Sequence, residues 1–214
     1  MIKQEKQVFY QTSNTYSTLN KLSSQTKNVW LVCHGLGYLS RFFITYFKIL
    51  NPKENYIIAP QAPSKYYQSS DFKYVGASWL TKENTKAETK NVLTYLDAVF
   101  AEEKISTDKK FIVFGFSQGV SVSTRWLASR KIEPDILVIY AGSIPKELKP
   151  SDFSYLKKTK VKIIYGNKDP FITAEKLKKE QVFAEYLFGK ERIEIIPFEG
   201  KHEVKTAMIE KIID

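Results

Sequence analysis

One serine of the chain stands in a context typical of a catalytic nucleophile. Ser117 is the centre of GFSQG (115–119), which matches the pattern G-x-S-x-G. A hydrophobic run, KFIVFG (110–115), precedes it and an amphipathic segment, 118–130, follows. A serine at such a strand-to-helix turn projects its hydroxyl above the sheet, and flanking glycines leave room for the turn. The alternative is a tight turn without chemistry.

A serine hydroxyl is a weak nucleophile until a base removes its proton. The chain has two histidines, His34 and His202. Where a strand–turn–helix serine is the nucleophile, the acid and then the histidine follow it along the chain, so only His202 qualifies. It lies in FEGKHE (198–203), directly after an apolar run. We predict that His202 is the base, the alternative being an exposed histidine near a helix start, and that His34 is a structural loop residue.

The base needs a carboxylate that orients it, and Asp169 is the first choice. It lies in GNKDPF (166–171), just past the apolar run VKIIYG (161–166). Residues past the carboxyl ends of parallel strands meet at one edge of the sheet, where ligands bind. Asp152 and Glu199 are weaker candidates for this acid. An Asp-Pro turn without a catalytic role is the other interpretation.

Acyl transfer also needs backbone N–H groups that stabilise a developing oxyanion. Gln118 follows the nucleophile at the start of a predicted helix, where the helix dipole favours negative charge. The second donor should come from a loop after an early strand. We expect it to be the N–H group of Leu36 in HGLG (34–37).

Apolar runs alternate with helical patterns along the chain, which predicts an α/β fold: a mostly parallel central sheet with helices on both faces. The expected strands are 28–35, 55–60, 110–115, 135–142, 161–166 and 192–198, with an opening hairpin of 6–11 and 15–19. The expected helices are 39–49, 83–104, 118–130, 173–188 and 202–213, with Thr173 as the N-cap of the fourth.

One long segment, 61–82, breaks this alternation and is rich in aromatic residues. Long connections in compact domains tend to be functional or disordered, and the aromatics argue for order. Its part 64–82 is a candidate pocket wall or minimal lid, or else a structural crossover that fills core. We list Tyr66, Tyr67, Trp79 and Phe171 as candidate substrate contacts. The chain has little room for a large cap domain.

Length and composition fit one globular domain, residues 1–214, with 43% hydrophobic and 26% charged residues. The net charge is +10, but only four of the 33 basic residues are arginine and the lysines are scattered. We therefore expect a solvated surface and no nucleic-acid partner. No signal peptide or membrane-spanning run is recognisable, and the single cysteine, Cys33, fits a reduced compartment, so we expect a cytoplasmic protein without stable membrane insertion.

Six motifs in order, CHGLG (33–37), PQAP (60–63), Ser78-Trp79, GFSQG, GNKDPF and GKHE (200–203), resemble those of the α/β-hydrolases. More narrowly, the chain resembles the phospholipase/carboxylesterase family, which includes acyl-protein thioesterases. The resemblance implies a triad of Ser117, Asp169 and His202, an oxyanion hole from Leu36 and Gln118, and no metal or organic cofactor. We expect ester or thioester substrates with small to medium acyl groups, because a site without a large cap domain is open. Two positions depart from the family pattern: Tyr38 replaces an aspartate, and Val120 replaces a second glycine after the nucleophile.

Two other interpretations remain from the sequence. A peptidase, lactonase or acyltransferase on the same fold would use the same residues. A non-catalytic binding protein on a hydrolase scaffold is a different class, and the intact spacing of the triad speaks against it.

Overall fold

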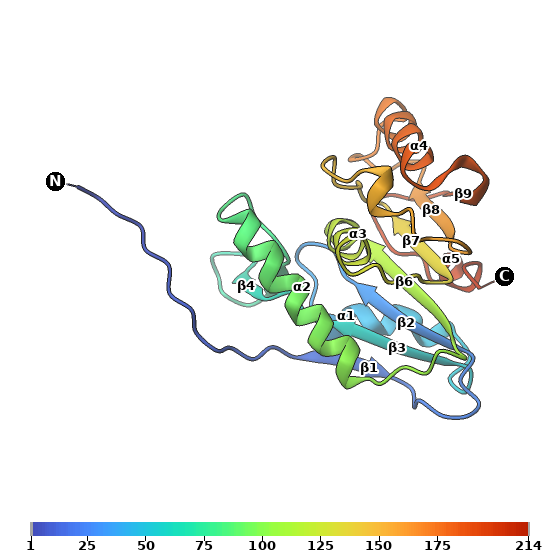
Figure 1. Ribbon diagram of the computed structural model, residues 1–214, viewed down its shortest axis with the longest axis horizontal. Helices are drawn as coiled ribbons and strands as arrows, with labels where there is room; N and C mark the ends of the chain where they lie inside the picture. Colours follow the sequence, from blue (N-terminus) through green and yellow to red (C-terminus); the bar gives the residue numbers. More distant parts are fainter. Residues whose placement is uncertain (1, 214) are drawn as a thin grey trace.

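The structure, a computed structural model, describes residues 2–213, and a seven-stranded sheet forms its centre (Figure 1). In spatial order the strands are β1 (Tyr16–Leu19), β3 (Asn55–Pro60), β2 (Asn28–Cys33), β6 (Lys110–Phe116), β7 (Ile136–Tyr140), β8 (Lys160–Gly166) and β9 (Ile193–Phe198). Only β1 runs antiparallel to its neighbour, and the other pairs are parallel. The predicted mostly parallel sheet is confirmed.

Helices cover both faces of this sheet. They are α1 (Ser40–Phe43), η1 (Ile44–Ile49), α2 (Thr85–Glu102), α3 (Gln118–Arg130), η2 (Pro150–Asp152), α4 (Ala174–Phe188), η3 (Lys190–Arg192) and α5 (Thr206–Glu210). One apolar cluster joins the sheet to α2, α3 and α4, and the other joins it to α1, η1 and α5. The predicted arrangement of helices on both faces is therefore correct.

Alternation within the strands explains the two clusters. In β2, Val29 and Leu31 belong to the cluster under α2 and α3, whereas Trp30 and Val32 belong to the opposite one. Every residue of β2 is buried, because both faces are covered. This is why the central strands read as continuous apolar runs.

Three predicted elements differ from the structure, and one of them is the helix predicted over 202–213, which is the shorter α5 (Thr206–Glu210). Residues 6–11 form no strand but are exposed and extended, since β1 pairs with β3 and not with the segment before it. The predicted helix 39–49 is a short α1 continued by the 3₁₀ helix η1. The Thr173 N-cap is confirmed, because its hydroxyl accepts a hydrogen bond from the Lys176 N–H at 3.2 Å.

The aromatic segment contains a hairpin that the sequence pattern does not predict. β4 (Ser64–Tyr67) pairs antiparallel with β5 (Val75–Ser78) as a separate two-stranded sheet. All of β4 is exposed, whereas the last three residues of β5 are buried. The hairpin thus has a buried base and an exposed outer strand.

None of the helices in residues 2–213 combines the length and the apolar character that crossing a bilayer requires.

Candidate active site

Ser117 occupies a strained turn between β6 and α3. Its φ of 51° lies in the left-handed region, which is uncommon for a residue with a side chain. The flanking glycines are required by close backbone packing: a Cβ atom on Gly119 would lie 2.0 Å from the Cys33 carbonyl oxygen. A Cβ atom on Gly115 would lie 2.6 Å from the Val120 Cα atom. Strain held by such packing is typical of functional sites.

Two hydrogen bonds connect Ser117, His202 and Asp169, the predicted catalytic triad. The Ser117 Oγ atom lies 3.0 Å from His202 Nε2, and the His202 Nδ1 atom lies 2.7 Å from Asp169 Oδ2. Ser117 follows β6, His202 follows β9 and Asp169 follows β8. All three therefore lie at the carboxyl edge of the sheet. An N–H donor at Nδ1 leaves Nε2 as the acceptor for the serine proton.

The carboxylate is buried and fully engaged. Asp169 is 5% exposed, and its Oδ1 atom accepts a hydrogen bond from the Phe171 N–H at 2.8 Å while Oδ2 faces the histidine. The imidazole of His202 lies between two rings, at centroid distances of 5.2 Å from Phe116 and 5.0 Å from Phe171. Both phenyl rings thus pack against the imidazole that makes the two hydrogen bonds.

The other two candidate acids lie elsewhere in hydrogen-bond networks of their own. Asp152 accepts a hydrogen bond from the Lys149 N–H at 2.8 Å, and Glu199 forms an ion pair of 2.7 Å with Lys168. Of the three carboxylates considered, Asp169 is the one that meets the imidazole.

The loop that carries Leu36 lies beside the nucleophile. A Cβ atom on Gly35 would lie 3.2 Å from the Ser117 Cβ atom, so this glycine allows the loop to approach. Gln118 begins α3, where the first N–H groups of a helix have no partner within the helix. The loop 34–37 and the start of α3 thus both lie next to Ser117, and the oxyanion roles of Leu36 and Gln118 stay a prediction.

His34 is buried and holds neighbouring loops together. Its Nδ1 atom lies 2.8 Å from the Gly35 carbonyl oxygen, and its Nε2 atom accepts a hydrogen bond from the Ala62 N–H at 3.1 Å. Burial lowers the pKa of His34 to about 4. A neutral imidazole with both nitrogens occupied has the structural role that was predicted.

The four predicted substrate contacts lie in different environments. Tyr66, Tyr67 and Phe171 are exposed, and Phe171 contacts His202. Trp79 has no exposed surface, and its indole N–H donates to the His34 carbonyl oxygen at 2.8 Å. The prediction that Trp79 contacts substrate is therefore corrected: the side chain supports the site from within the core.

The two departures from the family pattern have packing explanations. The ring of Tyr38 packs edge-on against Phe116, with centroids 5.8 Å apart, directly before the nucleophile. The side chain of Val120 is buried against Gly142, where a Cβ atom would lie 2.5 Å from it. Both changes place apolar contacts around Ser117 and leave its hydrogen bonds intact.

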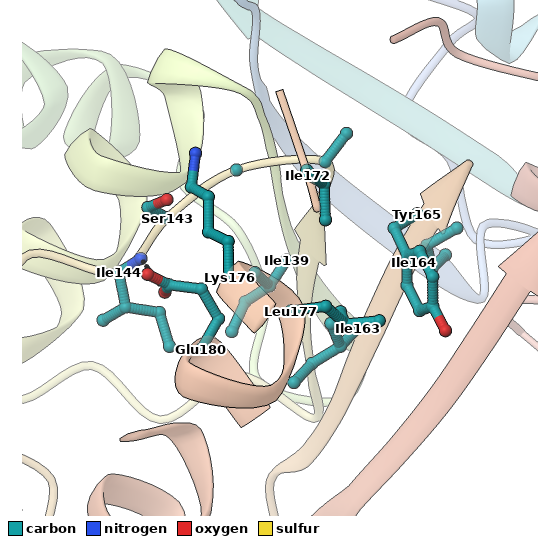
Figure 2. A pocket seen from close by; sticks show the side chains of 12 residues that line it. Ile139, Ser143, Ile144, Ile163, Ile164, Tyr165, Ile172, Lys176, Leu177 and Glu180 are labelled. Atoms are coloured by element: carbon teal, nitrogen blue, oxygen red, sulfur yellow. Dashed lines mark hydrogen bonds between the residues drawn. The ribbon is translucent and has the colours of Figure 1, made fainter. Parts of the chain in front are cut away.

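A small apolar cavity lies under α4, beside the loops that carry the site (Figure 2). Ile139, Ile163 and Leu177 form its apolar wall, and Glu180 closes one side by accepting a hydrogen bond from the Ile144 N–H at 3.1 Å. Its volume is about 20 Å³. A space of this size holds about one water molecule.

Metal ligands do not gather in residues 2–213: no group of three or more His, Cys, Asp or Glu side chains is placed to hold an ion.

The sheet order, the two helical layers and the strand-end residues define an α/β-hydrolase fold. The sequence model of the phospholipase/carboxylesterase family matches residues 14–214. The chain therefore belongs to that family. No curated protein sequence matches the chain significantly.

Solved structures of low sequence identity share the fold. Acyl-protein thioesterase 2 of Zea mays superposes with a TM-score of 0.69 at 14% identity, covering 94% of this chain and 96% of the other. A phospholipase/carboxylesterase from Dyadobacter fermentans gives a TM-score of 0.64 at 19% identity, covering 95% and 96%. A carboxylesterase of Bacillus cereus gives 0.64 at 15% identity, covering 92% and 91%.

Proposed function

We propose that the chain is a serine hydrolase that cleaves carboxylic esters or thioesters through an acyl-enzyme on Ser117. The observation that carries the proposal is the unbroken series of hydrogen bonds from Ser117 through His202 to the buried Asp169. Membership of the phospholipase/carboxylesterase family agrees with it.

The first half of the reaction forms the acyl-enzyme. The Ser117 Oγ atom attacks the carbonyl carbon while His202 Nε2 takes its proton, and Asp169 stabilises the imidazolium that results. The N–H groups of Leu36 and Gln118 stabilise the oxyanion of the tetrahedral intermediate. The intermediate collapses, the bond to the leaving group breaks, and His202 gives its proton to the departing alcohol or thiol.

The second half releases the acid. Water attacks the acyl-enzyme and loses a proton to His202, the bond to Ser117 breaks, and the proton returns to the serine oxygen. The enzyme is regenerated, and one water molecule is consumed for each ester or thioester bond cleaved. Each step uses the protein groups already described.

Exposed apolar side chains favour an acyl group of small to medium size that binds in an open site. Leu36 and Phe171 are 55% and 63% exposed beside the triad. The nearby cavity under α4 is too small to take an acyl chain. The substrate is therefore a small molecule that binds across the open surface formed by Leu36 and Phe171 beside the triad.

Steady-state hydrolysis of nitrophenyl esters and acyl-thioesters of increasing chain length tests the proposal. We expect turnover by the wild type and loss of nearly all of it in Ser117→Ala. Equal turnover by both proteins would refute a Ser117 acyl-enzyme. A peptidase, lactonase or acyltransferase would instead turn over its own substrates, with the same dependence on Ser117.

A further inference from the structure

We propose that the side chain of Gln118 is a positioning group that braces the two oxyanion donors against each other. The proposal rests on the proposed function, since it concerns the geometry of the same oxyanion hole. The backbone N–H of Gln118 would be one donor, whereas its side-chain amide points to a different task.

The amide group of Gln118 is bound at both ends to a segment about forty positions earlier in the chain. Its Oε1 atom accepts a hydrogen bond from the Trp79 N–H at 2.8 Å, and its Nε2 atom donates to the Leu80 carbonyl oxygen at 2.7 Å. Nε2 also lies 3.1 Å from the Ser78 Oγ atom. One side chain therefore fixes three consecutive residues at the base of the β4–β5 hairpin.

The same segment holds the loop of the second donor on both sides. The Trp79 indole N–H donates to the His34 carbonyl oxygen at 2.8 Å, and the Gly37 N–H donates to the Ala77 carbonyl oxygen at 2.9 Å. His34 and Gly37 flank Leu36. The two donors are thus linked through one bridge, from the Gln118 side chain through residues 77–79 to the loop 34–37.

The middle of the bridge, residues 77–79, is buried. Ala77 and Trp79 have no exposed surface, and Ser78 is 5% exposed. A further contact comes from the hairpin itself, because Gln68 Nε2 donates to the Gly37 carbonyl oxygen at 2.5 Å. Hydrogen bonds shielded from water are stronger and hold geometry more tightly.

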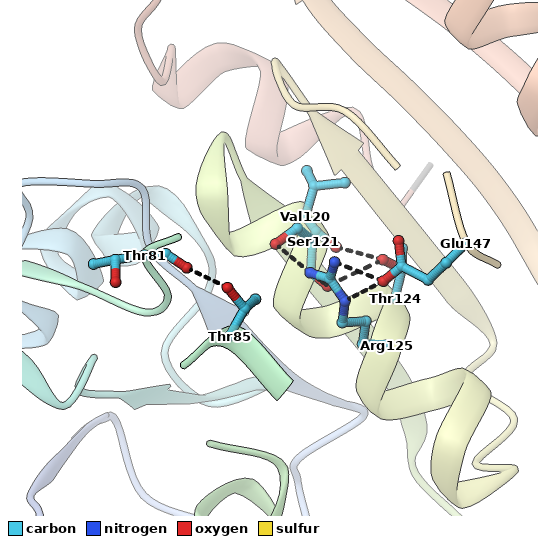
Figure 3. Close-up of polar contacts among 7 residues, drawn as sticks. All are labelled: Thr81, Thr85, Val120, Ser121, Thr124, Arg125 and Glu147. Atoms are coloured by element: carbon cyan, nitrogen blue, oxygen red, sulfur yellow. Dashed lines mark hydrogen bonds and ion pairs between the residues drawn. The ribbon is translucent and has the colours of Figure 1, made fainter. Parts of the chain in front are cut away.

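Two segments next to the bridge have hydrogen bonds of their own (Figure 3). Just beyond Leu80, the Thr85 hydroxyl at the start of α2 donates to the Thr81 carbonyl oxygen at 2.8 Å. On α3, the Arg125 Nε atom donates to Glu147 at 2.7 Å, which ties the helix to the loop after β7. The segment after the hairpin base is thus tied to the start of α2, and α3 is tied to the loop after β7.

Oxyanion stabilisation depends on donors whose positions are fixed before the reaction, and a displacement of about 1 Å can cost on the order of 100-fold in rate. Loss of the bridge leaves both backbone N–H groups in the chain but frees Leu36 relative to Gln118. The cost should therefore fall on kcat and not on substrate binding.

Gln118→Met tests the bridge, because it keeps the backbone N–H and the length of the side chain but removes all three contacts. We expect kcat per active site, counted by complete fluorophosphonate labelling, to fall roughly 10- to 100-fold with KM within about threefold. If the Gln118 side chain only stabilised the fold, the variant would have a lower melting temperature but no selective loss of kcat over KM. A loss in kcat of less than about fivefold would overturn the proposal.

If Gln118→Met does not fold, substitutions of two matched tryptophans test the bridge instead. Trp79 and Trp126 are both fully buried and each donates one indole hydrogen bond, Trp126 to Asp97 Oδ1 at 2.9 Å. Trp79→Phe breaks the bridge and Trp126→Phe does not. We expect Trp79→Phe to lower kcat at least about fivefold more than Trp126→Phe, and equal losses would contradict the bridge.

Ser117→Ala, measured beside these variants, separates the two proposals. Inactive Ser117→Ala together with fully active Gln118→Met would refute the bridge alone. Undiminished turnover by Ser117→Ala would refute the hydrolase proposal, and the bridge with it.

Discussion

The Nε2 atom of His202 lies 3.0 Å from the Oγ atom of Ser117, although 85 positions separate the two residues along the chain. β6 delivers the serine and the loop after β9 delivers the histidine, with β7 and β8 between them in the sheet. The contact therefore depends on correct assembly of half the sheet.

Asp169→Asn should lower kcat on the order of 10⁴-fold, because an amide N–H facing Nδ1 would favour the wrong imidazole tautomer. Asp152→Asn is the matched control: its carboxylate caps η2 and does not meet His202. We expect it to keep activity within about twofold. Similar losses in both variants, measured by ester hydrolysis, would argue against Asp169 as the orienting acid.

Acid should destabilise the protein through His34. The pKa of this buried imidazole is lowered from 6.5 to about 4, so the unfolded chain binds more protons between these values. Stability should fall as the pH falls from about 6.5 to about 4, by up to roughly 3 kcal/mol from this group. Nε2 of His34 now accepts a hydrogen bond from the Ala62 N–H. Protonation of Nε2 would replace this hydrogen bond by two N–H groups that face each other.

Urea unfolding of the wild type and His34→Gln across this pH range measures the effect. The stability difference between the two proteins should shrink at low pH, because the variant lacks the titrating group. A difference between wild type and His34→Gln that is constant with pH would exclude this linkage.

Gly119→Ala should be severely destabilising, because its Cβ atom would lie 2.0 Å from the Cys33 carbonyl oxygen, a backbone atom that cannot move aside. We expect a loss of more than about 3 kcal/mol or failure to fold. Ser129→Ala, near the other end of α3, should change stability by about 0.5 kcal/mol or less. Thermal unfolding compares the two, and equal stabilities would show that the β6–α3 turn is less tightly packed than described.

Phe171→Ala should alter substrate preference with little effect on stability, because this side chain is 63% exposed and meets His202 edge-on. Tyr186, also 63% exposed but on α4, provides the matched control in Tyr186→Ala. KM and kcat for esters of different chain length should change only in the first variant. Identical chain-length profiles for wild type and Phe171→Ala would remove Phe171 from the substrate site.

The features that could be predicted from sequence are those for which burial or local backbone geometry determines the residue types of a short segment. β2 and β6 are covered on both faces, so their sequences are continuously apolar. The turn at Ser117 needs glycines at fixed positions because backbone atoms approach there. The strands and the nucleophile turn were accordingly recognisable.

The remaining features depend on partners distant in the chain. β4 is wholly exposed and is a strand only because it pairs with β5, whereas residues 6–11 have the same local character but no pairing strand. Trp79 was expected to contact substrate because its segment is aromatic, yet its indole is buried against the His34 carbonyl oxygen. Neither pairing nor the direction of a side chain is contained in a local pattern.

Intact-mass analysis after reaction with a fluorophosphonate tests the central claim most directly. The wild type should gain one phosphonyl group, located on Ser117 by peptide mapping, and Ser117→Ala should gain none. His202→Gln should label far more slowly than the wild type, because the serine would lack its base. Labelling at another residue, or undiminished labelling of Ser117→Ala, would contradict a nucleophile activated through His202 and Asp169.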